Sequence, residues 1–379
     1  MLKKWQLLGQ VYPDYYAASY NYAYFVWHLQ NRASEGIKAI QPALSEHDPQ
    51  RAGAYYTLAF LQAAENQFDA AEKNFRMAEA SGSPAQGGNH AAAYAAQRRF
   101  SDAAKMLDQA RFTGMPGTDI YLRTQRAAFD VDQGNWQQAA DRISSGAGEA
   151  AASGKFYSRI HRARQLSLDD YLVPKAEQIA ALKSFIAEAR GAIENKADAN
   201  HSDDVFLMLF GAYLAARAGD LSMAKTTLDV TLPQAHGSGY SNIEHMLVIV
   251  EAEIAWRSGR AGDAVLLLEP MRDGSELYLT HVAKADAYSA AGRTEDALTE
   301  ATWLAGHRGR AYMETNSLHM LQARYVAESD LALLRVAELN AKLGRREQSD
   351  KALHEFFLVW PQAQQLSFVA PRLAALAKP

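Results

Sequence analysis

The sequence predicts an all-α protein built from stacked pairs of antiparallel helices. Alanine is spread along the whole chain, whereas only 11 of the 379 residues are proline, and this composition favours helix. The alternation of valine, isoleucine and threonine that is typical of strands is nearly absent. In addition, small residues recur at the same place in a helical pattern about every 34 residues. We therefore expect a right-handed superhelix of helical hairpins, in one or two lobes.

The stretch 52–85 shows the repeating unit most clearly. Ala59 lies in a first helix, and Ala71 follows twelve residues later in a second helix, ahead of Phe75 and Ala78. Two antiparallel helices cross closely only where both carry a small side chain, and a large residue one turn further on fills the space beside the crossing. A single pair cannot bury its apolar face, so each pair must stack on its neighbours.

The same template fits further stretches of the chain. In the first candidate repeat, 17–50, Tyr24 stands at the position of the small residue, so the helix crossing there must be looser or shifted by one residue. Glycines after several first helices are expected to adopt the left-handed conformation that ends a helix. These glycines are Gly134, Gly219, Gly259, Gly292 and Gly344, and the equivalent small residues of later second helices include Ala139, Ala264 and Ala297. The candidate repeats are 17–50, 52–85, 84–117, 120–150, 205–238, 245–277, 278–310 and 330–363.

These stretches resemble the tetratricopeptide repeat (TPR) family. The matching residues are Leu58, Ala59, Phe68, Ala71, Phe75 and Ala78 in the second repeat, and Ala285, Tyr288, Ala297 and Ala301 in the seventh. The resemblance implies a superhelix in which the first helices of successive repeats line a concave groove that binds a protein or peptide segment. The alternative is a non-repetitive helical bundle that is rich in alanine.

A closer resemblance covers the C-terminal part of the chain. The LLEP stretch, the AYxxAGR turn, the HRG tripeptide and the FFLVW ending are similar to the C-terminal TPR region of bacterial multidomain signalling proteins. In those proteins the array follows a serine/threonine kinase domain or a winged-helix DNA-binding domain. The resemblance therefore implies a signalling or regulatory role.

The template fails in the middle of the chain. Between residues 146 and 204 the small-residue spacing is lost, although 172–196 keeps apolar residues at helical spacing. We expect three segments: an N-terminal TPR array over 1–150, a degenerate helical connector over 151–204, and a C-terminal array with a capping helix over 205–379. A second irregular stretch, 306–317, is expected to precede an extra helix.

The register of the first helices predicts which residues face the groove. They mix aromatic and apolar side chains with a few acids, which suits an extended or helical peptide with apolar anchors. The candidates are Asn21, Phe25, Tyr56, Phe60, Ala63, Tyr121, Thr124, Met246, Ile249, Glu253, Trp256, Leu279, Val282 and Asp286.

Composition argues against several other classes. The net charge is −4 with a pI near 6.3, so we expect no nucleic-acid partner for this region. There is no cysteine, which excludes disulfides and thiolate sites, and no apolar run approaches the length of about 18 residues that a membrane-spanning helix needs. The stretch GEAAASGKF, 148–156, has the wrong glycine spacing for a phosphate-binding loop. We expect no catalytic residue, no metal and no cofactor.

The expected function is therefore a non-catalytic protein-binding, peptide-binding or ligand-sensing region of a bacterial signalling or regulatory protein. The sequence does not identify the compartment; we expect such a region to be cytoplasmic, or periplasmic if the parent protein carries an upstream membrane helix. The alternatives are an accessory subunit or helical-repeat domain of an enzyme, and a structural scaffold that self-associates. The sequence identifies neither the partner nor the oligomeric state.

Overall fold

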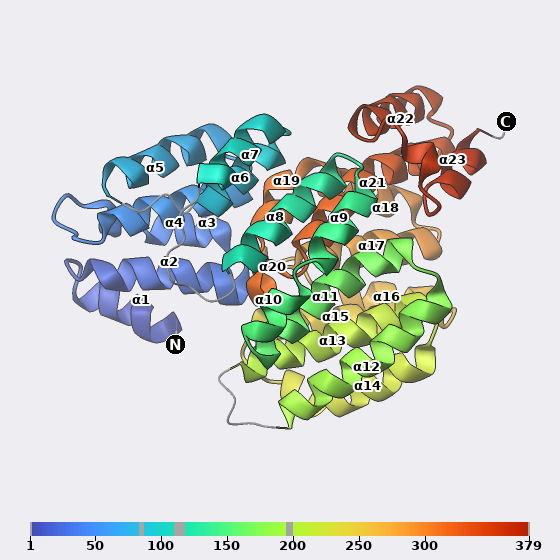
Figure 1. Cartoon of the computed structure of the whole chain (residues 1–379), viewed down its shortest axis with the longest axis horizontal. Helices are drawn as coiled ribbons and strands as arrows, with labels where there is room; N and C mark the ends of the chain where they lie inside the picture. Colours follow the sequence, from blue (N-terminus) through green and yellow to red (C-terminus); the bar gives the residue numbers. More distant parts are fainter. Residues whose placement is uncertain (1, 83–86, 110–117, 195–199, 378–379) are drawn as a thin grey trace. The chain divides into compact units, whose positions relative to one another are not determined.

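The computed structural model describes residues 2–82, 87–109, 118–194 and 200–377, and within these ranges every regular element is a helix (Figure 1). The all-α prediction is confirmed. The helices form two compact units, one of Met1–Thr118 with His307–His319 and one of Asp119–Gly306 with Met320–Pro379. The cuts between these units do not coincide with the boundaries at 150 and 204 drawn from the sequence. The division into an N-terminal array, a connector and a C-terminal array stays a prediction.

Unit 1 is built from four helical pairs and a segment that enters from much later in the chain. The pairs are α1 with α2, α2 with α3, α4 with α5, and α6 with α7, while α19 packs against α4 and α6. The bounds are α1 Leu2–Val11, α2 Tyr16–Gln30, α3 Ala33–Ala39, η1 Gln41–Leu44, α4 Arg51–Ala64, α5 Phe68–Ala80, α6 Gly87–Ala96, α7 Phe100–Gln109, α19 Arg308–Met313 and α20 Asn316–His319.

The helix crossings in unit 1 lie at the small residues. Ala59 and Ala71 are both fully buried where α4 meets α5. At the first pair, a Cβ on Gly36 of α3 would lie 3.1 Å from the Ala23 carbonyl oxygen of α2. Tyr24 itself is 37% exposed, so the crossing is shifted by one residue to Ala23.

Unit 2 contains the longer helices. Its bounds are α8 Thr118–Asp132, α9 Trp136–Ser144, α10 Ala147–Ala152, α11 Lys155–Leu172, α12 Lys175–Ile193, α13 His201–Ala218, α14 Leu221–Ala235, α15 Ser241–Arg257, α16 Ala261–Leu268, α17 Tyr278–Ala290, α18 Thr294–Gly306, α21 Gln322–Lys342, α22 Arg346–Val359, η2 Ala363–Gln365 and α23 Ala370–Leu376. The predicted connector therefore holds two full helices, α11 and α12, which pack against each other and against α13.

The predicted repeat register holds in unit 2. The pairs α13–α14, α15–α16, α17–α18 and α21–α22 pack along their lengths, and the predicted glycines have positive φ. The small residues at the expected crossings, Ala127, Ala139, Ala252, Ala264, Ala285 and Ala297, are all 0% exposed. Pairs of small side chains, twelve residues apart within a hairpin, therefore set how closely the helices approach.

The last irregular stretch of the sequence is better ordered than predicted. Residues 306–317 include the short helix α19, which belongs to unit 1. The following helix, α21, is 21 residues long, and it packs against α17, α18 and α11. Among the described residues, no helix combines the length and the apolar character that crossing a membrane requires.

Candidate functional site

The predicted groove residues divide into two groups. Eight are buried, with at most 4% of each exposed, so they pack within the array and are not available to a partner; six remain partly exposed. The buried residues are Phe60, Ala63, Thr124, Met246, Ile249, Glu253, Leu279 and Val282. The partly exposed residues are Asn21, Phe25, Tyr56, Tyr121, Trp256 and Asp286.

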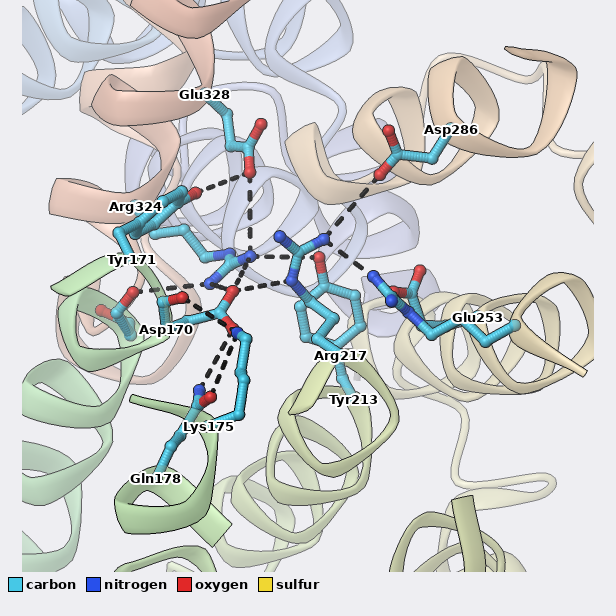
Figure 2. A network of polar contacts seen from close by, with 12 residues as sticks. Asp170, Tyr171, Lys175, Gln178, Tyr213, Arg217, Glu253, Asp286, Arg324 and Glu328 are labelled. Carbon is cyan, nitrogen blue, oxygen red and sulfur yellow. Dashed lines mark hydrogen bonds and ion pairs between the residues drawn. The ribbon is translucent and has the colours of Figure 1, made fainter. Parts of the chain in front are cut away.

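In unit 2 a buried network of charges fills the side lined by the first helices of the pairs (Figure 2). At its centre is Asp170, near the end of α11. Its Oδ2 accepts a hydrogen bond from Arg217 Nε at 2.7 Å and from both terminal nitrogens of Arg324 at 3.1 Å. Its Oδ1 accepts from Lys175 Nζ at 3.0 Å and from Gln178 Nε2 at 3.1 Å. A single carboxylate thus joins α11, α12, α13 and α21.

A second layer of pairs extends this network outward. The Tyr171 hydroxyl donates to Glu328 Oε1 at 2.6 Å, and Arg335 Nη2 lies 3.1 Å from Asp286 Oδ1. Arg217 Nη1 lies 3.8 Å from a carboxylate oxygen of Asp286, and 3.8 Å from one of Glu253. The network therefore ties α15 and α17 to the same centre.

The electrostatics of the network favour charged forms. Burial alone would raise the pKa of Asp170, but Arg217, Arg324 and Lys175 together hold that pKa well below its ordinary value. Burial also opposes the charge on Glu328, yet Arg335, Arg324 and Arg217 lower its pKa. Asp170 and Glu328 are thus each held ionised by several cations, so neither is poised to exchange a proton near neutral pH.

The network brings together two predicted residues, Glu253 and Asp286, and several that the sequence analysis missed. Glu253 and Asp286 each follow the small residue of a helix crossing, and Tyr213 has the same position after Ala212. That shared position directs all three toward the same side, and Arg217 lies one turn after Tyr213. The register could therefore have identified Arg217. Asp170 and Arg324 lie outside the candidate repeats, where no such signal exists. Arg335 lies within the candidate repeat 330–363, but it does not directly follow a small residue of a helix crossing.

In unit 1 the corresponding side is occupied by the chain's own α19, which Figure 1 shows beside α6. Arg308 Nε donates to the Ala96 carbonyl oxygen at 2.9 Å, at the end of α6. The Gly309 amide donates to Asn66 Oδ1 at 2.8 Å, just beyond α4. The Arg310 guanidinium lies 4.9 Å from the centre of the Trp27 ring of α2.

A set of rings on α2 remains accessible beside this segment. Tyr20 and Tyr24 stack with centroids 6.4 Å apart, and Tyr24 and His28 stack at 3.8 Å. Tyr24 is 37% exposed, whereas Tyr20, Phe25 and His28 are half-buried. We call Tyr20, Tyr24, Phe25 and His28 the α2 strip. Tyr56, by contrast, packs edge-on against Phe75 of α5, toward the second helix of its own pair.

The histidine of the α2 strip gives unit 1 a pH dependence. Burial lowers the pKa of His28 to about 4, although its Nδ1–H donates to the Tyr24 carbonyl oxygen. Because the folded pKa lies below the ordinary value, this contribution to stability is complete above about pH 6.5 and is lost as the pH falls toward 4. We expect unit 1 to lose about 1 kcal/mol between pH 7 and 5, after allowing for the partly exposed ring. Chemical denaturation of the wild type and His28→Gln at both pH values measures this, with the exposed His47→Gln as control; an equal loss in wild type and His28→Gln would contradict it.

A cleft of about 730 Å³ lies between the start of α11 and the end of α12. Its lining includes Lys155, Phe156, Arg159 and Glu188. Arg159 forms a bidentate ion pair with Asp204 at 2.7 and 2.8 Å, so its charge is already neutralised. Gly154 and Lys155, from the stretch 148–156, border this cleft. No group of three or more metal-ligating side chains gathers anywhere in the described ranges.

Comparison with known proteins gives no family assignment. No family model matches the chain, and no curated protein matches it. Among solved structures, a monomeric mutant of IFIT1 with Gppp-AAAA is similar over 92% of this chain and 77% of its own, with 13% identity and a TM-score of 0.44. The human IFIT1 dimer with m7Gppp-AAAA is similar over 87% and 72% of the two chains, with 14% identity and a TM-score of 0.42. The human IFIT1 dimer with PPP-AAAA gives 14% identity and a TM-score of 0.41.

One expectation from the sequence needs correction. The absence of a nucleic-acid partner was inferred from the net charge of −4, but the similar solved structures carry RNA with capped or triphosphate ends. The physical reason is that net charge averages over the whole chain, whereas binding depends on the local arrangement of cations. Net charge alone therefore does not exclude nucleic acid for an all-α chain of this kind.

Proposed function

We propose that this chain is a non-catalytic helical-repeat protein that captures a segment of a partner protein on the α2 strip. The supporting observation is that ring surface of α2 stays accessible in unit 1 with α19 in place. Tyr24, 37% exposed, stacks between Tyr20 and His28 on this helix.

The chemistry of the α2 strip favours an apolar or aromatic anchor. Stacked rings offer a flat apolar surface at small cost in side-chain entropy, and tyrosine hydroxyls can also donate hydrogen bonds. Asn21 contributes little to recognition because its amide already donates to the Ala17 carbonyl oxygen of the same helix at 2.8 Å. An extended or helical segment with one large apolar side chain is the partner that fits.

The biological setting that we propose is regulation. It rests on the likeness of the C-terminal LLEP, AYxxAGR, HRG and FFLVW stretches to TPR regions of bacterial signalling proteins. A kinase or winged-helix domain encoded in the same reading frame would support this setting. A full reading frame that encodes no such domain would argue against it.

Replacing Tyr24 with alanine is expected to reduce partner capture at least about tenfold, because it removes the most exposed ring of the α2 strip. The assay is affinity capture with the full chain as bait, followed by titration of each recovered partner. Tyr240→Ala is the matched control, because Tyr240 is also 37% exposed but lies in unit 2. If every partner binds Tyr24→Ala as well as it binds Tyr240→Ala, the strip is not the capture site.

A further inference from the structure

The segment 307–314 is held in unit 1 as a bound peptide would be. Its contacts lie on α2, α4 and α6, more than 200 residues earlier in the sequence. The residues on either side of it, up to Gly306 and from Met320, belong to unit 2. The segment is therefore a ligand that the rest of the chain supplies to unit 1.

The first part of the contact lies at the C-terminal end of α6. The last carbonyl groups of an α-helix lack partners within the helix and carry partial negative charge, so a guanidinium group is well suited to them. Arg308 fills this role at α6, with Nε 2.9 Å from the Ala96 carbonyl oxygen and Nη2 3.5 Å from that of Ala95. A basic residue at this position is thus favoured by the geometry of unit 1.

The second part of the contact admits only glycine. A Cβ at residue 309 would lie 1.9 Å from the Ala63 carbonyl oxygen and 2.8 Å from Asn66 Oδ1. Asn66 has φ 58°, which turns the chain at the end of α4, and its side chain accepts the Gly309 amide at 2.8 Å. The close approach of the two backbones therefore selects a residue without a side chain.

The third part of the contact is an arginine on an aromatic ring. Arg310 lies over the Trp27 ring at 4.9 Å and pairs with Glu314 at 3.3 Å. Together the contacts define the pattern Arg-Gly-Arg as the sequence that this face of unit 1 accepts.

We propose that this face of unit 1 is a recognition site for basic, glycine-containing segments of this pattern, and that residues 307–314 are its resident ligand. A partner segment with the same pattern occupies the site when the resident segment leaves. Because the resident segment is tethered at both ends, its effective concentration is of millimolar order, so a free peptide does not compete with it in the wild-type chain.

The test uses the full chain and a fluorescent synthetic peptide with the sequence of residues 307–315. Gly309→Glu removes the resident segment, because its side chain collides with Ala63 and adds negative charge near two helix ends. We expect this variant to bind the peptide at least about tenfold more tightly than the wild type does. A peptide that carries Gly309→Ala should bind the Gly309→Glu protein at least about tenfold more weakly than the wild-type peptide does. Equal binding of both peptides, or no gain over wild type in a variant with unchanged helical circular dichroism, would overturn the inference.

A second variant keeps the test decisive if Gly309→Glu does not fold. The double change Arg308→Ala and Arg310→Ala removes the anchors of the resident segment without a steric collision, and it should also gain affinity for the wild-type peptide; failure to do so overturns the inference. This site does not depend on the α2 strip. Adding Tyr24→Ala to either variant should leave peptide affinity within about twofold, and a loss of binding there would assign the peptide to the strip instead.

Discussion

Asp170→Asn is expected to lower the free energy of unfolding of unit 2 by about 3–5 kcal/mol. The substitution keeps the shape of the side chain but removes the charge that neutralises Arg324, which is 0% exposed, and Arg217, which is 16% exposed. An arginine cannot release its proton to escape this cost. The buried guanidinium groups are then left only with more distant carboxylates, 3.7–3.8 Å away. Chemical denaturation followed by circular dichroism measures the loss.

The matched control for Asp170 is an exposed pair in the same unit. Glu295→Gln breaks its pair with Arg345, whose side chains are 59% and 42% exposed, and should change stability by less than about 1 kcal/mol. Acid gives an independent check. Because the folded pKa of Asp170 lies below its ordinary value, the contribution of its charge is present above about pH 4 and is lost as the pH falls further. A loss from Asp170→Asn no larger than that from Glu295→Gln would refute the role assigned to the network.

Trp136→Ala should cost about 3–5 kcal/mol. Trp136 is 2% exposed, and its ring meets those of Tyr171 at 5.2 Å, Trp360 at 5.4 Å and Phe368 at 4.8 Å. Trp360 also donates from Nε1 to the Asp132 carbonyl oxygen at 3.2 Å. The substitution therefore leaves a cavity where α9 and α11 meet the C-terminal segment 360–368.

Leu358→Ala is the control for Trp136, because Leu358 is 68% exposed and its loss should cost no more than about 0.5 kcal/mol. The difference between the two variants is best measured by urea denaturation at a fixed pH. A cost for Trp136→Ala below about 1 kcal/mol would mean that the C-terminal segment does not pack as described.

The repeat fold could be predicted from the sequence because its main determinant is local. Ala59 and Ala71, or Ala285 and Ala297, stand twelve residues apart in a single hairpin, so their spacing is visible without knowing what surrounds the hairpin. The shift of the first crossing to Ala23 was one of two alternatives at Tyr24, and the structure decides between them because Gly36 approaches the Ala23 carbonyl oxygen.

Which side chains and which segment fill the side lined by the first helices could not be predicted in the same way. Register shows that Met246 and Leu279 lie on the side lined by first helices. It cannot show that Asp170 and Arg324 form a buried ion pair on that side. The contact between Gly309 and Asn66 joins positions 243 residues apart, and no periodicity encodes such a pairing. The α2 strip was only partly predicted, through Phe25, because Tyr24 was considered as a crossing residue and not as a surface residue.

The central claim is that the chain occupies the first-helix side of unit 1 with its own segment. Amide hydrogen exchange of residues 309–313 in the wild-type chain tests this claim most directly. These amides are expected to exchange as slowly as those of α4 and at least about tenfold more slowly than those of the exposed turn 236–240. Exchange of 309–313 as fast as that of 236–240 would contradict the account.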